Sequence, residues 1–231
     1  MKNVFVVLKK KFLVCVLVVL TMATGVLGVV GAKKTMSPKP QFAIVVDAGH
    51  GGVDGGAVGS QTGITENELN LQFAQTLKQI CQEYGWKVVL TRSDLSGLYS
   101  PLASNKKRSE MEKRKEIIEK SKADLVVSIH MNSFVDKSVC GANVFYAKES
   151  VQGQMLANAV QEIFFETMQV RNSKAKVGDY YILNCADKPS ILIECGFLSN
   201  DKEELLLQDK EYQQQMCYAI FCGILKYFES L

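Results

Sequence analysis

Residues 42–60 read FAIVVDAGHGGVDGGAVGS, an apolar run that leads directly into a glycine-rich loop. An apolar run without polar alternation, as at 42–46, is typical of a strand that is buried on both faces of a sheet. Parallel strands covered by helices have two such faces, whereas antiparallel hairpins commonly leave one face to water. This stretch therefore predicts an α/β fold in which the loop lies at the carboxyl end of the first strand.

The segments that follow alternate between helical and strand patterns. A helix is predicted to begin at Thr65, because Thr65 and Glu68 form a Thr-x-x-Glu capping box and apolar residues then recur with helical spacing. Further strands are predicted at residues 86–90, 125–129, 142–146 and 190–193, and further helices at 108–121, at 151–168 and, in two pieces, from 200 to 228. We expect a single α/β domain with a mostly parallel sheet covered by helices.

The N-terminal residues 1–32 are expected to lie outside this domain. Four lysines within residues 2–11 precede an uncharged run of 21 residues, 12–32, which as a helix would span roughly 30 Å, the thickness of a bilayer core. This hydrophobic helix is either a cleaved signal peptide or an uncleaved signal anchor, and its lysines place the N-terminus in the cytoplasm. Residues 33–40 are then a linker, and residues 41–231 form a domain that acts outside the membrane.

Composition excludes some classes of protein. With 47% hydrophobic and 22% charged residues among 231, the chain is not mainly disordered. Four of its 27 basic residues lie before position 12, where no acid occurs, so the rest of the chain is close to neutral against 24 acids. Nucleic-acid binding is therefore not expected. The six cysteines after residue 32 lack a CxxC spacing and are predicted to be mostly small buried hydrophobes.

Three polar side chains come at or just beyond the carboxyl ends of predicted strands. The chain has two histidines: His50 comes four residues after the first strand, and His130 directly follows the strand at 125–129. Glu194 directly follows the strand at 190–193. Ligands of open α/β sheets bind beyond the carboxyl ends of the strands, so we expect these three side chains to meet at one edge.

Two imidazoles and a carboxylate form a catalytic zinc set, which leaves a fourth position for water or substrate. Glu66 is the candidate carboxylate, because the loop after His50 is long enough to bring the helix start back over the sheet edge. Acids are also favoured in the first turn of a helix by its dipole, and spacing alone does not decide between these two roles for Glu66. Glu68 is better explained by the capping box.

A zinc hydrolase also needs a proton carrier that is not a metal ligand. Glu194 fits, because an otherwise apolar strand end would raise its pKa toward that of a general base. Cys195 allows a rival reading as a Cys–His thiol hydrolase with His130 or His50, which leaves the other histidine and Glu66 without a role. The glycine-rich loop lacks both the Gly-Lys-Ser/Thr ending of a P-loop and the spacing of a dinucleotide site.

Four blocks occur in a characteristic order: VVDAGHGGVDGGAVG, TENELNLQFA, ADLVVSIHMNS and PSILIECGFLSN. Together they resemble the zinc-dependent N-acetylmuramoyl-L-alanine amidases of bacterial cell walls, over about residues 41–229. The family's zinc ligands fall on His50, Glu66 and His130, and its catalytic glutamate falls on Glu194. The resemblance also implies a twisted, mostly parallel sheet flanked by helices.

The resemblance implies a reaction as well. The substrate would be the amide between the lactyl group of muramic acid and L-alanine in peptidoglycan, with one Zn²⁺ per domain and Glu194 carrying the proton. Asp47 and Asn132 flank the ligands and are predicted to orient an imidazole or to bind substrate. Because no wall-binding repeats flank the domain, targeting is expected from the N-terminal segment or from a partner protein.

A minimal domain behind one hydrophobic segment is similar to the germination-specific amidases of spore formers, which strip peptide from cortex muramic acid on the way to muramic-δ-lactam. The chain departs from the family where an Ala-Asn pair is usual, since Ile118 and Glu119 stand there. Two alternatives stay open: a non-catalytic wall-binding protein with the amidase fold, and a zinc peptidase of another specificity. A protein activator is also left open.

Overall fold

The computed structural model describes residues 42–231, so the predicted leader at 1–32 and the whole predicted linker at 33–40 lie outside the described residues. The strands are β1 (Ala43–Ala48), β2 (Lys87–Leu90), β3 (Leu125–Asn132), β4 (Asn143–Tyr146), β5 (Lys176–Val177) and β6 (Ser190–Phe197). The helices are α2 (Glu66–Glu83), α3 (Lys106–Lys120), α4 (Val151–Thr167), α5 (Tyr181–Asn184), α6 (Asp201–Leu206) and α7 (Lys210–Glu229). Within this described part, no helix is both long enough and apolar enough to cross a bilayer.

The strands form one six-stranded sheet in the order β2-β1-β3-β6-β4-β5. The pairs β1–β2, β1–β3, β3–β6 and β4–β5 are parallel, and β4 runs antiparallel to β6. The predicted α/β domain with a mostly parallel sheet is therefore confirmed. The three strands predicted to carry site residues, β1, β3 and β6, are adjacent at the centre of the sheet.

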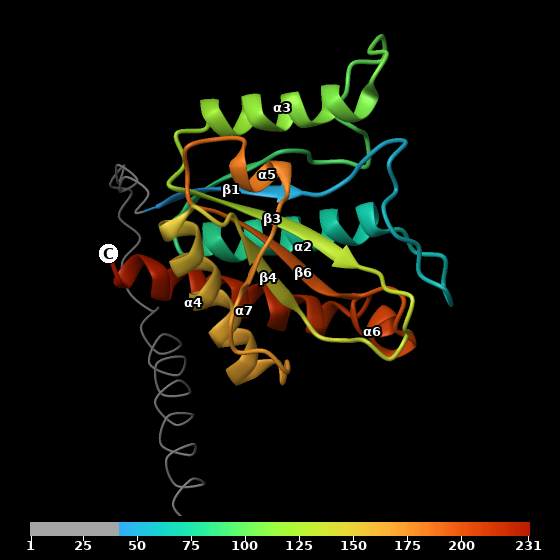
Figure 1. Ribbon diagram of the computed structural model, residues 1–231, viewed down its shortest axis with the longest axis vertical. Helices are drawn as coiled ribbons and strands as arrows, with labels where there is room; N and C mark the ends of the chain where they lie inside the picture. Colours follow the sequence, from blue (N-terminus) through green and yellow to red (C-terminus); the bar gives the residue numbers. More distant parts are fainter. Residues whose placement is uncertain (1–41) are drawn as a thin grey trace, which may run out of the picture. The chain divides into compact units, whose positions relative to one another are not determined.

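Helices cover both faces of the sheet (Figure 1). Helices α2, α4 and α7 pack on one face over the larger apolar cluster, and α3 and α5 lie on the other face over a smaller cluster. Successive residues of a strand point to opposite faces. Accordingly, Val127 and Ile129 of β3 belong to the larger cluster, whereas Val126 belongs to the smaller one. The alternation places His130 on the α3 and α5 side.

The predicted ends of three strands are too early: β1, β3 and β6 continue to Ala48, Asn132 and Phe197, whereas β2 and β4 end at residues 90 and 146 as predicted. His130 and Glu194 lie inside β3 and β6, and they face each other as register partners. Strand pairing continues beyond His130 and Glu194 to Asn132 and Phe197, across a register shift. A polar side chain does not end a strand, because the backbone N–H and C=O groups of the residue still pair with the neighbouring strand. Two short elements, β5 and α5, were not predicted, since neither is long enough to show a periodic pattern.

Candidate active site

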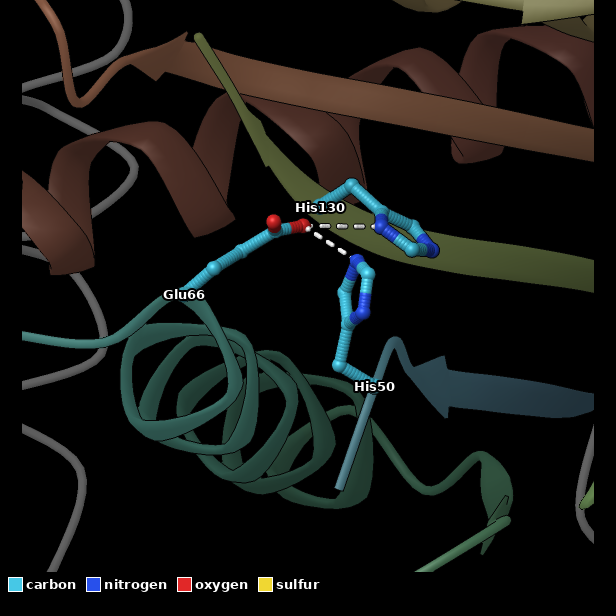
Figure 2. Close-up of side chains that lie close together, drawn as sticks. All are labelled: His50, Glu66 and His130. Carbon is cyan, nitrogen blue, oxygen red and sulfur yellow. Dashed lines mark hydrogen bonds and ion pairs between the residues drawn. The ribbon is translucent and has the colours of Figure 1, made fainter. Parts of the chain in front are cut away.

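Three elements bring the predicted metal ligands together. His50 stands in the turn after β1, His130 stands near the end of β3, and Glu66 is the first residue of α2. Figure 2 shows the three side chains pointing toward one another. Oε1 of Glu66 lies 3.0 Å from Nε2 of His50 and 2.9 Å from Nδ1 of His130. The capping box of Thr65 and Glu68, which the sequence predicts, fixes where α2 begins and hence where Glu66 points.

This arrangement fits a metal ion. One donor atom from each of His50, Glu66 and His130 lies within 4.8 Å of the others, and imidazole nitrogen with carboxylate oxygen is a donor set that zinc prefers. The backbone makes room for these side chains. A Cβ atom on Gly49 would lie 2.2 Å from the ring of His130, and one on Gly56 would lie 2.3 Å from Oε2 of Glu66.

Hydrogen bonds orient the carboxylate of Glu66. Its Oε2 accepts from the backbone N–H of Ala57 at 2.9 Å, which leaves Oε1 for the histidines. The side-chain amide of Asn70, one helical turn further along α2, donates to Oε1 at 3.3 Å and to the carbonyl of Gly49 at 3.1 Å. The Oδ1 atom of Asn70 is buried without a partner among the described residues. Asn70 thus links the glycine-rich loop to the ligand carboxylate.

A second carboxylate orients His50. Nδ1 of His50 lies 2.8 Å from Oδ1 of Asp54, so Nε2 is the nitrogen that faces Glu66. The other oxygen of Asp54 accepts a hydrogen bond of 2.6 Å from the ammonium of Lys107 on α3. A carboxylate that fixes the tautomer of a ligating imidazole is a common partner in zinc sites. Sequence reasoning missed Asp54, although its place four residues after His50 in the same loop was a usable signal.

Glu194 is set apart from the three predicted metal ligands. It extends from β6 beside His130, it is buried, and its Oε2 has no hydrogen-bond partner in the described residues. Burial raises the pKa of Glu194 to about 7, with the nearby imidazole of His130 acting in the opposite direction and Glu66 adding to the rise. A buried, unpaired carboxyl group with such a pKa is suited to take up and release a proton near neutral pH.

The pKa of Glu66 is shifted in the opposite direction from that of Glu194. Burial alone would raise its pKa, but hydrogen bonds from His130 and His50 hold the pKa of Glu66 well below its usual range. The pKa of His50 is raised: burial opposes the charged imidazole, and the contacts to Glu66 and Asp54 outweigh that effect. The two glutamates are therefore chemically distinct, one suited to hold a cation and the other to carry a proton.

Asp47 and Asn132 line the same cleft, but their hydrogen bonds lead elsewhere. Asp47 is buried and accepts from Thr91, Ser128 and Arg114. The side chain of Asn132 accepts from the backbone N–H of Ser133 at 2.8 Å. A role for either in binding substrate stays a prediction.

The thiol of Cys195 lies away from the histidines. Cys195 is fully buried in the larger apolar cluster, on the other face of β6 from Leu192 and Glu194, and burial raises its pKa well above the ordinary value. A thiolate nucleophile is not available in such surroundings. The thiol-hydrolase reading is therefore wrong. Four cysteines are buried as predicted, and two are exposed: Cys140 and Cys222.

The site opens into a cleft of about 430 Å³ between the sheet and the layer of α3 and α5. The three predicted metal ligands and Glu194 line this cleft. Lys107 and Met111 of α3 form one wall, and Tyr180 and Tyr181 at the start of α5 form the other. This volume and mixture of aromatic, apolar and charged groups are typical of a small-molecule or peptide site. The wall residues were not predicted, because nothing in the sequence places α5 above the sheet.

Comparison with known proteins gives consistent results. A family model described as N-acetylmuramoyl-L-alanine amidase matches residues 44–226. The germination-specific N-acetylmuramoyl-L-alanine amidase of Bacillus subtilis is 34% identical over 189 residues, which cover 80% of this chain and 79% of that protein.

Solved structures show the same fold. The CwlD amidase from Clostridioides difficile, solved in complex with the GerS lipoprotein, is 37% identical with a TM-score of 0.78, covering 82% of this chain and 100% of that one. The catalytic domain of CwlV, an N-acetylmuramoyl-L-alanine amidase from Bacillus (Paenibacillus) polymyxa var. colistinus, is 31% identical with a TM-score of 0.72, covering 81% of this chain and 98% of that one.

Proposed function

This chain belongs to the N-acetylmuramoyl-L-alanine amidase family, and we propose that it is a zinc-dependent member that acts on spore cortex peptidoglycan. The bond cleaved is the amide between the lactyl group of muramic acid and L-alanine. One observation carries the proposal: three metal-binding side chains and a separate, unpaired carboxyl group converge at the floor of a single open cleft.

The residues divide the chemistry between them. His50, Glu66 and His130 would hold the zinc ion, which when bound supplies a Lewis acid that polarises the amide carbonyl and makes water more acidic. Glu194 takes the proton from the attacking water at its unpaired oxygen and delivers it to the nitrogen of the leaving L-alanine. Asp54 and Asn70 hold His50 and Glu66 in orientation throughout.

The walls of the cleft suggest how substrate lies. Tyr180 and Tyr181 are partly exposed aromatic rings on which an apolar sugar face or lactyl group can pack, and the exposed Lys107, whose ammonium group also pairs with Asp54, lines the α3 side. The stem peptide of peptidoglycan carries carboxylates, which can accept from the remaining N–H donors of the Lys107 ammonium group. We assign the peptide to the α3 side and the glycan to the α5 side.

The decisive experiment is hydrolysis of purified peptidoglycan by the full chain in detergent with zinc, followed by mass spectrometry of the products. Released peptides that begin with L-alanine, absent with a chelator and with Glu194→Gln, are expected. Peptides cleaved at another bond would instead indicate the zinc peptidase. Zinc binding without any release, also when a protein partner is supplied, would support the wall-binding alternative.

The cortex role rests on the germination-specific relative and needs its own test. Spores from a strain that lacks this protein are expected to contain cortex without muramic-δ-lactam, as measured by muropeptide analysis. A cortex with the normal lactam content would contradict the assignment. The proposed action on peptidoglycan requires a domain that works outside the cytoplasmic membrane. Attachment through residues 1–32 and activation by a partner remain part of the proposal, the latter supported by the lipoprotein bound to the CwlD relative.

A further inference from the structure

The turn that carries His50 has an unusual backbone. His50 has a φ of 60°, in the left-handed region that favours glycine, and it is followed by two glycines of positive φ. Two other non-glycine residues among those described have a positive φ: Lys122 and Gln169. Both are exposed and come just after helices α3 and α4, where such a conformation commonly ends a helix. His50 has no such explanation.

Arg92, which follows β2, binds the carbonyl groups of this turn. Its Nε donates to the carbonyls of Ala48 at 3.0 Å and His50 at 2.9 Å, and its Nη2 donates to the carbonyl of Gly49 at 2.9 Å. The same Nη2 reaches the carbonyl of Asn67 on α2 at 2.8 Å. One buried guanidinium group therefore ties three consecutive carbonyls of the turn to the helix that carries Glu66.

Arg114 on α3 binds the same turn from the other side. Its Nη1 donates to the carbonyl of Ala48 at 2.8 Å, and its Nη2 donates to the carbonyl of His50 at 2.6 Å. The two guanidinium groups thus share two acceptors, the carbonyls of Ala48 and His50. We call Arg92 and Arg114 the arginine pair.

Bringing two arginines together in a buried place is costly, and the surroundings show how it is offset. Burial, together with the charge of Arg114, lowers the pKa of Arg92 to about 10. Arg114 forms ion pairs with two buried carboxylates, Asp47 and Glu110, so two positive charges meet two negative ones. A turn that needed only a hydrogen-bond donor could have used a neutral side chain at lower cost.

We propose that the arginine pair consists of positioning residues that hold His50 in its left-handed conformation, so that Nε2 is already directed at the metal site before the ion binds. The inference rests on the proposed role of His50 as a ligand. Without the pair, the backbone at His50 would relax toward negative φ, and a Cα–Cβ bond that turns with it would carry the imidazole away from Glu66. Metal affinity depends on such preorganisation.

The test compares zinc affinity in Arg92→Lys and Arg114→Lys, which keep the charge but lose the forked geometry. The full chain in detergent is stripped of metal, and its zinc Kd is measured by competition with a fluorescent chelator, at a temperature where circular dichroism shows each variant folded. We expect Kd to rise by about 10-fold to 100-fold in each variant. The matched control is Arg108→Lys, an exposed arginine on α3 that pairs with Glu112; its Kd is expected to stay within about two-fold of wild type.

The outcomes separate the inference from the proposed function. Wild type that binds no zinc would contradict the metal role of His50. Tight binding by wild type together with an unchanged Kd in both folded variants would overturn only the positioning role.

A measurement on wild type covers the case in which neither variant folds. In the metal-free chain labelled with ¹⁵N-arginine, the Nε–H signal of Arg92 is expected to be protected from solvent exchange and to keep its shift when zinc is added. A signal that becomes protected only after zinc is added would overturn the inference, because the turn would then form around the ion.

Discussion

The two histidines of the site are held in different ways. His130 stands in β3, which pairs with β1 as far as Ile129 and with β6 at His130 itself, so the ladder sets the direction of the side chain. His50 stands in a left-handed turn, and the carbonyls of that turn are held by Arg92 and Arg114 from distant parts of the chain. A regular strand positions a ligand by its own geometry, whereas an irregular turn depends on side chains supplied by the tertiary structure.

The same contrast extends to the partners of the two ligands. We call His130 and its neighbour Glu194 the strand side of the site; Glu194 has a carboxyl group with an unpaired oxygen. We call His50 and its neighbour Asp54 the turn side of the site; the oxygens of Asp54 are paired with His50 and Lys107. The strand side therefore offers a carboxyl group with an unpaired oxygen, and the turn side offers a carboxylate whose oxygens are occupied by His50 and Lys107.

The largest expected effect is the loss of zinc and of activity, and it should be the same when either histidine is removed. His50→Ala and His130→Ala each remove one ligand, so each is expected to lose zinc in equilibrium dialysis and to reduce peptidoglycan hydrolysis below detection. Wild-type zinc content in either variant would show that its histidine is not a ligand and would break the equivalence of the two sides.

Glu194→Gln separates the strand side from the turn side. We expect kcat to fall by about 10²-fold to 10⁴-fold, because a general acid–base group is lost, while the zinc Kd stays unchanged. Glu162→Gln, at a surface ion pair with Lys226, is the control and is expected to keep wild-type kcat. Full turnover by Glu194→Gln would refute its role as proton carrier.

The stability of the metal-free chain should depend on pH with opposite signs on the two sides. The pKa of Glu194 is raised by burial to about 7, so its ionisation destabilises the fold as pH rises from about 4.5 through 7. Glu194→Gln should thus stabilise the chain at pH 8 by roughly 3 kcal/mol and have little effect at pH 4.

The ionisation of Asp54 should stabilise the fold, whereas that of Glu194 destabilises it. Burial opposes the ionisation of Asp54, but hydrogen bonds from Lys107 and His50 lower its pKa to about 2. The ionised carboxylate therefore adds to the free energy of unfolding above about pH 4, and this stabilisation is lost as the pH falls through 2. Asp54→Asn should therefore destabilise the chain at pH 7. Urea unfolding at several pH values measures both variants, and effects of the same sign at pH 7–8 would contradict the assignment.

The smallest expected effect compares glycine with alanine at the two histidines. At position 50 glycine tolerates a φ of 60°, so His50→Gly should be more stable than His50→Ala by about 1 kcal/mol. At position 130, inside a strand, His130→Gly should be less stable than His130→Ala by about 0.5–1 kcal/mol. Urea unfolding of the metal-free variants gives both differences, and a His50→Ala variant at least as stable as His50→Gly would show that the turn is not strained.

Much of the site could be predicted because its residues lie in short motifs. His50 follows a recognisable strand, Glu66 opens a helix, and His130 and Glu194 come directly after the apolar runs of their strands. The structure brings the first three within reach of one ion. Asp54 could have been found from its spacing to His50. Lys107, Arg92 and Arg114 could not, because they lie 42 to 66 residues from the turn groups that they bind, and no periodic pattern encodes such a contact.

By itself, the sequence determined the alternation of strands and helices, the parallel character of the central strands and the four blocks that carry the chemistry. These depend on local properties, namely apolar runs, capping residues and turn glycines, which act over a few neighbouring residues. Only the tertiary structure decided that β3 and β6 pair so that His130 faces Glu194, and that two buried arginines meet over the turn of His50. Such contacts depend on how distant segments pack, and the burial that raises one glutamate's pKa while hydrogen bonds lower the other's exists only once that packing is complete.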